Sequence, residues 1–338
     1  RPQPVSRPND AEMAELAAMV DAASKVSVYA GIGARDAREE IIAFCEKVKA
    51  PMVHTTRAKE FLEPNNPYNV GVNGILGNKA GVEALEDADL VISLGCDFAY
   101  TQFYPEAKKI VQIDIDPTHL GRRSAINMGL VGDAKTTFAA LTPLVAPKSD
   151  DSHLQTHLKQ WAEDLKGYDH EGEEHDPDLI HPQFVANMLD AKAVDDAIFV
   201  SDVGTAMVWM LRHLKANGKR RFLNSLLHGT MASGMPQAMG AKLAHPDKIC
   251  VNVWGDAAIG FTGMDFETAV RERIPILSIL LNNASMAIEL PIMQVATEKY
   301  RATDISGNYA EMAQAFGGYG ERVTDPGEIK AAIQRGVE

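Results

Sequence analysis

Short apolar segments alternate along this chain with stretches long enough to form helices, and this alternation restricts the fold more than any other feature. Residues 26–30, Val-Ser-Val-Tyr-Ala, predict a buried strand, and the amphipathic stretch 36–49 that follows predicts a helix. Strands separated by helices are typical of a doubly wound parallel sheet. We therefore expect an α/β fold.

The alternation occurs in two series, which indicates two domains. In the first series we expect further strands at 51–54, 90–94 and 110–115, and a closing helix at 134–144. In the second we expect strands at 197–200, 249–254 and 276–281, with helices at 184–189, 205–214, 265–273 and 329–336. We predict one doubly wound parallel-sheet domain over 1–147 and another over 181–338.

The segment between the two series, 148–180, contains a run of acidic residues and predicts a solvated linker with one helix inside it. At the other end, the last predicted helix has no strand after it. A doubly wound domain returns to its sheet after each helix, so we expect the second domain to be truncated at the C-terminus.

Charge and cysteine content exclude several classes of protein. With 33 Lys and Arg against 46 Asp and Glu, the chain has a net charge of -13, which disfavours nucleic-acid binding. No apolar run is long enough to span a bilayer, and the chain begins without the pattern of a signal peptide. Cys45, Cys96 and Cys250 are far apart in sequence, so we expect no disulfide framework and a cytoplasmic protein.

Polar residues follow two strands of the second series at the point where each strand ends. Gly255-Asp256 comes directly after one strand, and Asn282-Asn283 comes after the next. Ligands of open α/β sheets bind at the carboxyl ends of the strands, and carboxylate and amide oxygens suit Mg²⁺ or Ca²⁺. The alternative is structural: Asp256 caps the following helix and Asn283 lies in a turn.

A second glycine pattern, Gly31-Ile-Gly33-Ala-Arg35, follows the first predicted strand and precedes a helix. Backbone N–H groups in such a turn can bind the diphosphate of a dinucleotide. A pattern with two glycines is also what a tight turn between a strand and a helix requires, so both interpretations stay open.

These motifs resemble those of thiamine-diphosphate enzymes. Gly255-Asp256 and Asn282-Asn283 resemble the two ends of the thiamine-diphosphate motif, and residues 228–240 resemble the segment that supports the cofactor. More specifically, the segments 49–54, 66–71, 112–117, 195–199 and 217–221 are similar to pyruvate oxidases and pyruvate:quinone oxidoreductases. The resemblance implies a central, Rossmann-like FAD domain followed by most of a thiamine-diphosphate-binding domain.

In the second domain, the resemblance implies that Asp256, Asn283 and the Ser285 carbonyl bind Mg²⁺. Met231 would lie beneath the bridge between the cofactor's two rings, although an ordinary core methionine is the alternative. Ala257 stands where the family usually has glycine. The residues implied to bind thiamine diphosphate are Gly229, Thr230, Met231, Gly255, Asp256, Ala257, Ala258, Asn283, Ser285 and Met286.

In the first domain, the resemblance implies that FAD binds at the glycine turn and at three further segments. Asp114 ends a predicted strand, where its carboxylate can accept hydrogen bonds from a ribose. The residues implied to bind FAD are Gly31, Gly33, Arg35, Asn73, Gly74, Ile75, Leu76, Cys96, Asp97, Phe98, Tyr100 and Asp114.

The activity implied is oxidative decarboxylation of a 2-oxo acid, with pyruvate as the expected substrate and electrons passed from FAD to a quinone or O₂. Ile288 and Ile292 stand where the resembled oxidases carry an aromatic residue and a carboxylate that shape the pocket. One alternative is therefore a carboligase of the acetolactate synthase type, with a structural FAD.

Another alternative is a non-catalytic nucleotide-binding fragment. No segment resembles the N-terminal pyrimidine-binding domain that supplies the activating glutamate in this family, so we expect this chain to be incomplete as a catalyst. The resemblance further implies a homo-oligomer, usually a tetramer. It also implies a cytoplasmic location, with peripheral contact at the inner membrane face through a segment beyond this chain.

Overall fold

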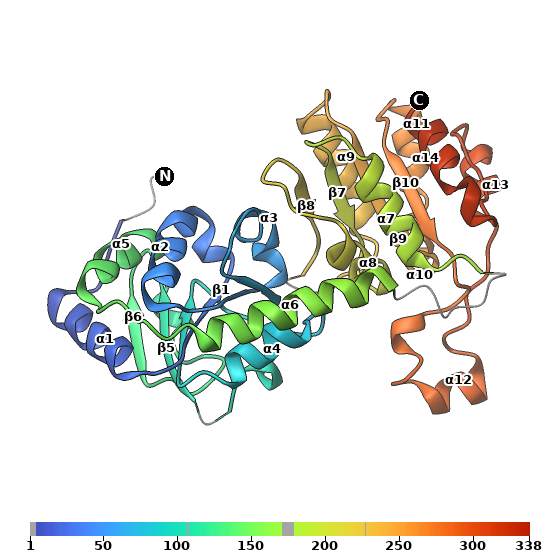
Figure 1. Cartoon of the computed structure of the whole chain (residues 1–338). Helices are drawn as coiled ribbons and strands as arrows, with labels where there is room; N and C mark the ends of the chain where they lie inside the picture. The colour runs from blue at the N-terminus through green and yellow to red at the C-terminus, as the bar shows by residue number, and fades with distance from the viewer. Residues whose placement is uncertain (1–4, 107, 171–178, 227) are drawn as a thin grey trace. The chain divides into compact units, whose positions relative to one another are not determined.

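The computed structural model of the chain describes residues 5–106, 108–170, 179–226 and 228–338 (Figure 1). It divides into two compact units, Arg1–Gly167 and Tyr168–Glu338. Each unit has its own sheet, and all neighbouring strands in both sheets are parallel. The predicted α/β fold with two parallel-sheet domains is therefore confirmed.

The sheet of the first unit has six strands in the order β3-β2-β1-β4-β5-β6. The chain winds outward from β1 to β3 and then returns to β4 on the other side, so the winding direction reverses between β1 and β4. Ligands of doubly wound sheets bind beside such a reversal, at the carboxyl ends of the strands. The strands are β1 Val26–Ala30, β2 Met52–His54, β3 Asn69–Val72, β4 Leu90–Leu94, β5 Lys109–Asp114 and β6 Met128–Val131.

Helices cover both faces of this sheet. They are α1 Asp10–Ala22, α2 Arg38–Val48, α3 Lys59–Leu62, α4 Lys79–Glu86, α5 Ala134–Leu144 and α6 Ser152–His170, with short 3₁₀ turns η1 Ile32–Ala37, η2 Thr56–Ala58, η3 Thr101–Phe103 and η4 Pro117–His119. Helices α1, α2 and α5 pack on one face of the sheet, whereas α4 and α6 pack on the other.

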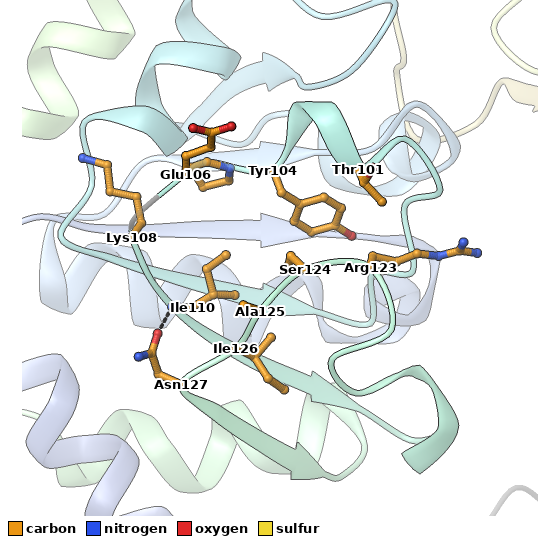
Figure 2. Close-up of a pocket in the computed structure, with 11 residues that line it drawn as sticks. Thr101, Tyr104, Glu106, Lys108, Ile110, Arg123, Ser124, Ala125, Ile126 and Asn127 are labelled. Carbon is orange, nitrogen blue, oxygen red and sulfur yellow. Dashed lines mark hydrogen bonds between the residues drawn. The ribbon is translucent and has the colours of Figure 1, made fainter.

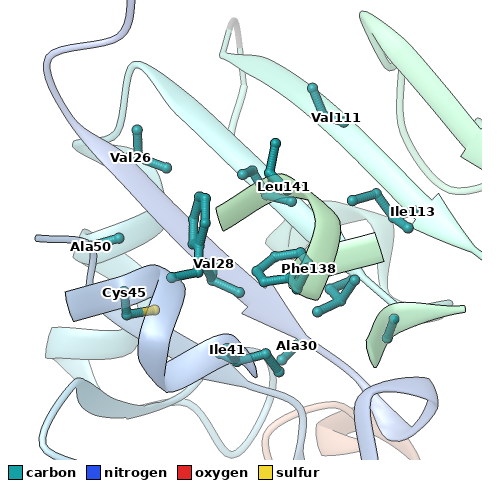
Figure 3. Close-up of a cluster of buried hydrophobic side chains, with 14 of the residues drawn as sticks. Val26, Val28, Ala30, Ile41, Cys45, Ala50, Val111, Ile113, Phe138 and Leu141 are labelled. Atoms are coloured by element: carbon teal, nitrogen blue, oxygen red, sulfur yellow. The ribbon is translucent and has the colours of Figure 1, made fainter. Parts of the chain in front are cut away.

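The alternation of side chains along β1 explains why both faces are covered. Val26 and Val28 belong to the core beneath α2 and α5, whereas Tyr29 belongs to the core beneath α4 and α6. Figure 3 shows Val28 with Phe138 and Leu141 of α5 beside it. All five residues of β1 are buried, as a strand covered on both faces requires.

Helix α6 occupies much of the segment 148–180 that was predicted to be a linker. Its Asp164 carboxylate accepts hydrogen bonds from the Asn78 side chain (2.9 Å) and the Ala80 N–H (2.8 Å) of the first unit. Trp161 and Leu158 pack against the core of that unit. The first half of the segment therefore belongs to the first unit because it buries apolar side chains there. Residues 171–178 of the acidic run lie outside the described residues.

The sheet of the second unit has four strands in the order β10-β9-β7-β8, and its winding direction reverses between β7 and β9. The strands are β7 Ile198–Ser201, β8 Arg221–Leu223, β9 Cys250–Gly255 and β10 Leu277–Leu281. The helices are α7 Pro182–Lys192, α8 Thr205–His213, α9 Gly234–Ala244, α10 Asp256–Thr262, α11 Asp265–Arg271, α12 Gln294–Tyr300, α13 Tyr309–Ala315 and α14 Ile329–Val337, with turns η5 Ala287–Glu289 and η6 Pro326–Glu328.

Two cores lie on opposite faces of this second sheet. Phe199 and Val253 face α7, α8 and α14, whereas Trp254 faces α9, α10 and α11. The three cysteines of the chain are free and buried. Over the described residues, no helix is both long and apolar enough to cross a membrane.

Candidate functional site

The predicted metal ligands of the second unit come from two adjacent strands. Gly255, the last residue of β9, pairs with Leu281, the last residue of β10. Asp256 and Asn282 therefore leave the sheet at the same carboxyl edge. Asp256 is the first residue of α10 and is only 2% exposed. The strand spacing thus predicted correctly that these polar residues leave neighbouring strands.

The Asp256 carboxylate is buried and only partly hydrogen bonded. Its Oδ1 accepts a hydrogen bond from the Ala257 N–H (2.9 Å), whereas its Oδ2 has no partner among the described residues. Burial raises the pKa of Asp256, and the N–H groups of Ala257, Ala284 and Ser285 lower it in part. A buried acceptor atom without a partner costs free energy, and a divalent cation would remove that cost. The site therefore fits a bound cation.

The turn after β10 lies beside this carboxylate. The N–H groups of Ala284 and Ser285 in the turn are close enough to lower the pKa of Asp256. Within the turn, the exposed Asn283 accepts a hydrogen bond from the Ser285 N–H (3.1 Å), and Ala284 has a φ of 57°. Ser285 forms an isolated antiparallel bridge with Asp304. Asn283 thus lies in a turn, as the structural alternative states, and the same turn lies beside Asp256.

The predicted metal site has few side-chain ligands. No group of three or more His, Cys, Asp and Glu side chains suited to a metal occurs among the described residues. The predicted ligand set contains one carboxylate, one amide and one backbone carbonyl, and is not such a group. Mg²⁺ typically takes few protein ligands and completes its shell with water and phosphate oxygens.

The predicted diphosphate loop precedes α9. Gly229 and Thr230 are exposed, and Gly229 has a φ of 60° that favours glycine. Met231 is half-buried and packs against the core that contains Trp254. The buried part of the Met231 side chain is therefore explained by core packing. The exposed part is accessible to a ligand.

Sequence reasoning missed Asp202, which directly follows β7 at the reversal of winding direction. Asp202 is fully buried and accepts hydrogen bonds from the N–H groups of Ala232 and Gly234, both at 2.8 Å. The signal was present in the sequence: an acidic residue and a glycine, Gly204, come just after a predicted strand, as they do at Gly255-Asp256.

The remaining predicted residues of this site differ in accessibility. Ala258 is 1% exposed and its side chain lies in the hydrophobic core, so only its backbone is available to a ligand. Ala257 and Met286 are half-buried. Ile288 lies on the turn η5 and is 41% exposed.

In the first unit, the two glycines of the Gly31–Arg35 turn have a structural explanation. The Gly31 N–H donates to the Leu94 carbonyl (2.9 Å) and the Gly33 N–H to the Gly95 carbonyl (3.0 Å). A Cβ atom on Gly31 would lie 2.3 Å from the Gly95 oxygen. The two N–H groups expected to bind a diphosphate thus already donate hydrogen bonds within the fold, as the tight-turn interpretation states. Flavin binding at this turn stays a prediction.

The structure brings the other predicted flavin segments together. Gly74 packs so closely on the Phe98 ring that a Cβ atom would lie 2.4 Å from it, and Asn73 donates to the Phe103 carbonyl (2.8 Å). Tyr100 lies on the same aromatic cluster, with its ring centroid 5.5 Å from that of Phe98. Residues 73–76 and 96–100 therefore meet at the carboxyl edge of the sheet.

Three of the other predicted flavin residues, Asp97, Asp114 and Arg35, have partners within the fold. Asp97 pairs with Arg122 and Arg123, and Asp114 accepts a hydrogen bond from the Asp116 N–H (2.9 Å). The Arg35 guanidinium lies over the Phe61 ring, 5.5 Å from its centroid. Ile75 is 52% exposed, whereas Leu76 and Cys96 are buried.

A hollow of about 380 Å³ lies elsewhere on the first unit, outside all the predicted sites. Figure 2 shows Tyr104 and Ile110 in it, with Arg123, Lys108 and Glu106 around them. None of the predicted cofactor residues lines this hollow, so it carries no assignment.

Two comparisons with domain families decide the identity of both units. Residues 13–141 match the central domain of thiamine pyrophosphate enzymes, and residues 202–338 match their C-terminal TPP binding domain. The chain carries the central and C-terminal domains of a thiamine pyrophosphate enzyme. Thiamine pyrophosphate is thiamine diphosphate under its other name. The second match begins at Asp202 and contains the Gly229–Met231 loop, Asp256 and Asn283.

Curated relatives of this thiamine pyrophosphate enzyme chain match it along nearly its whole length. YdaP of Bacillus subtilis (strain 168), whose name describes a thiamine pyrophosphate-containing protein, is 32% identical over 334 residues, covering 98% of this chain and 58% of its own. The acetolactate synthase large subunit of Corynebacterium glutamicum is 30% identical over 355 residues, covering 99% and 56%. The large subunit of acetolactate synthase isozyme 2 of Escherichia coli (strain K12) is 27% identical over 335 residues, covering 96% and 59%.

The chain spans less than three fifths of the length of these relatives. Two of the three are named as acetolactate synthases, and none of the three is named as a pyruvate oxidase. The chain thus carries two domains of the thiamine pyrophosphate enzymes, and the narrower resemblance to pyruvate oxidases stays a prediction.

Proposed function

We propose that this chain is part of an enzyme that uses thiamine diphosphate and Mg²⁺ to decarboxylate a 2-oxo acid such as pyruvate and to join the product to a second 2-oxo acid. This is carboligation of the acetolactate synthase type. The observation that carries the proposal is the buried Asp256 carboxylate with a partnerless Oδ2, placed beside the Asn283–Ser285 turn. The similarity to acetolactate synthases supports carboligation over oxidation.

The residues of the second unit would have distinct roles in this proposal. Asp256, Asn283 and the Ser285 carbonyl would hold the cation, and the cation would bind the cofactor's diphosphate. The exposed Gly229 and Thr230 would contact that diphosphate, and Met231 would support the cofactor from below. When bound, the cofactor supplies an electron sink that stabilises the carbanion left by loss of CO₂.

The first unit would bind FAD in a structural role. Support comes from its strand order and from the meeting of residues 73–76 with residues 96–100 at the carboxyl edge of the sheet. We further propose a cytoplasmic homo-oligomer, with the activating glutamate supplied by a region outside this chain.

The second candidate is a flavin-dependent oxidase, which would pass electrons from FAD to a quinone or O₂. The segments 49–54, 66–71, 112–117, 195–199 and 217–221, which resemble pyruvate oxidases, favour it. It differs from the carboligase in its product and in its flavin: the flavin of an oxidase accepts electrons from the substrate, whereas a structural flavin does not.

Anaerobic mixing of the intact protein with thiamine diphosphate, Mg²⁺ and pyruvate separates the two candidates. We expect acetolactate to form while the visible absorbance of any bound flavin stays unchanged. Bleaching of that absorbance without acetolactate would overturn the carboligase proposal in favour of the oxidase. Absence of Mg²⁺-dependent thiamine diphosphate binding would overturn both.

A further inference from the structure

One buried carboxylate holds the end of the predicted diphosphate loop. Asp202 Oδ1 accepts hydrogen bonds from the N–H groups of Val203 (2.7 Å) and Ala232 (2.8 Å), and Oδ2 accepts one from the Gly234 N–H (2.8 Å). Asp202 is 0% exposed. An aspartate at this depth requires such donors, because burying a carboxylate without partners is costly. These bonds join the end of β7 to the residues that follow Met231.

The loop contains one residue with an uncommon backbone conformation. Ala232 has a φ of 68°, which is uncommon for a residue with a Cβ atom. Its N–H is bound by Asp202, and its carbonyl accepts a hydrogen bond from the Thr262 hydroxyl (2.9 Å). Thr262 is the last residue of α10, the helix that begins with Asp256. The loop is therefore anchored both to β7 and to the helix that carries the predicted metal ligand.

Close packing leaves no room for a side chain at Gly234. A Cβ atom there would lie 2.5 Å from Asn252 Oδ1 and 2.8 Å from Asp202 Oδ2. Asn252 is 0% exposed and lies on β9, between β7 and β10 in the sheet. Because only a glycine fits, the Gly234 backbone lies directly against two buried polar side chains, and its N–H reaches Asp202.

We propose that Asp202 is a positioning residue that fixes the segment 229–234 in its cofactor-binding conformation before the cofactor arrives. The inference rests on the proposed function and deepens it. Asp202 acts through backbone N–H groups, and its atoms are used within the fold. A loop ordered in advance loses less conformational entropy on binding, so the anchor raises the affinity for the diphosphate group.

The test compares Asp202→Asn with the wild-type intact protein. Asparagine keeps one acceptor oxygen and the same volume, but its NH₂ group cannot accept the hydrogen bond from Gly234. Two quantities are measured: the dissociation constant of thiamine diphosphate in the presence of Mg²⁺, by titration calorimetry, and hydrogen exchange of residues 229–234 without cofactor. We expect Asp202→Asn to bind thiamine diphosphate about 10- to 100-fold more weakly, which is the usual effect of mutating residues that orient metal ligands. We also expect faster exchange of residues 229–234, which cofactor binding largely reverses.

Asp190→Asn is the matched control. Asp190 is a half-buried carboxylate of the same unit that accepts hydrogen bonds from Arg220 and the Lys215 N–H. Its loss should lower the thermal unfolding temperature and leave the dissociation constant unchanged. A second variant, Thr262→Val, releases the same loop at the Ala232 carbonyl and should weaken cofactor binding several-fold while Asp202 stays intact.

The outcomes separate this inference from the proposed function. Wild-type protein that binds no thiamine diphosphate overturns the proposed function, and the inference with it. Wild-type protein that binds the cofactor, together with an unchanged dissociation constant in Asp202→Asn, overturns the inference alone. If Asp202→Asn does not fold, the Thr262→Val variant decides: faster exchange of residues 229–234 with unchanged affinity overturns the inference, because ordering of the loop then does not raise the affinity.

Discussion

Gly255 and Leu281 are paired in the parallel ladder of β9 and β10, and this register brings the polar residues after both strands to one edge of the sheet. Asp256 is buried at that edge with a partnerless oxygen, and the Asn283–Ser285 turn lies beside it. Burying this carboxylate without a ligand lowers the stability of the fold. The same desolvation raises the pKa of the carboxyl. Such a cost is typical of functional sites.

Replacing Asp256 by alanine should separate function from stability. We expect Asp256→Ala to weaken Mg²⁺-dependent binding of thiamine diphosphate by more than about 100-fold. Mutation of a residue that only hydrogen bonds to a metal ligand already lowers metal affinity by about 10- to 100-fold. Without cofactor, the unfolding temperature should stay the same or rise, because a desolvated carboxylate is removed. Calorimetric titration and thermal unfolding measure the two effects.

Asp265→Ala serves as the control for this prediction. Asp265 begins α11 and is half-buried in the same unit. Its substitution should leave cofactor affinity unchanged. Equal cofactor affinity in the wild type and Asp256→Ala would remove Asp256 from the site.

The close approach of Gly31 to Gly95 predicts a purely structural effect of substitution. A Cβ atom on Gly31 would meet the Gly95 oxygen at 2.3 Å and Cys96 Cα at 2.6 Å. We expect Gly31→Ala to destabilise the first unit by about 1–3 kcal/mol, as overpacking typically does, and to do so in the absence of flavin. Urea unfolding of flavin-free protein measures the loss.

The matched control is Gly167→Ala, because nothing lies within 4 Å of the position of its Cβ atom on α6. Alanine in a helix should stabilise the protein slightly or leave it unchanged. If Gly31→Ala destabilised only the flavin-bound protein, the glycine would serve the ligand and the tight-turn explanation would fail. Heat release followed by chromatography shows which nucleotide, if any, the protein binds.

The sequence predicted best those elements that bury many apolar side chains. The strand 26–30 and the helix 134–144 have the same bounds in the structure as in the prediction, because their apolar residues face dense cores. The strands β3, β6 and β8 were missed. In β6 and β8 only Leu130 is buried, and β3 is Asn-Val-Gly-Val, so each of the three has little apolar pattern. Helix α10 was missed because 256–262 contains small residues and glycine.

The candidate site was predictable only where it depends on strand ends. Asp256 and Asn283 follow strands, so their meeting depends on local spacing and parallel pairing. The role of Asp202 depends on hydrogen bonds to residues 30 and 32 positions later, which no local pattern contains. The docking of α6 depends likewise on partners distant in sequence, such as Asn78 for Asp164.

The docking of α6 on the first unit should depend on pH. His153 Nε2 lies 2.9 Å from Ser27 Oγ, which itself donates to the Ala84 carbonyl (2.6 Å). Burial and the neighbouring His157 and Lys25 lower the pKa of His153 to about 4. The unfolded chain therefore takes up the proton first as pH falls. The free energy of unfolding of the first unit should be highest above about pH 6.5, the ordinary pKa of histidine, and should fall towards pH 4.

Urea unfolding at pH 7.5 and pH 4.5 measures this dependence. Asp87 and Asp89 also face the histidine pair and oppose the shift in part. His153→Gln should reduce the difference between the two pH values, whereas the exposed His245→Gln should not. An unchanged difference in His153→Gln would assign the pH dependence to other groups.

Ile288 gives the most demanding prediction about the pocket. It lies on η5 and is 41% exposed in the described chain, so Ile288→Phe should change stability by less than about 0.5 kcal/mol. If its exposed side faces the substrate, a larger ring reduces the space for a branched 2-oxo acid. We expect kcat/KM for such a substrate to fall about 10-fold or more, within the range that a misfit of one methylene group produces. Cofactor affinity should stay the same, because the predicted metal ligands are untouched.

The comparison with pyruvate as substrate makes this experiment specific. Pyruvate is smaller, so its kcat/KM should fall less than that of the branched acid in Ile288→Phe. Val295→Phe, on α12 at 66% exposure, is the control and should change neither value. An equal effect on both substrates would indicate a general disturbance of η5, and no effect on either would place Ile288 outside the pocket.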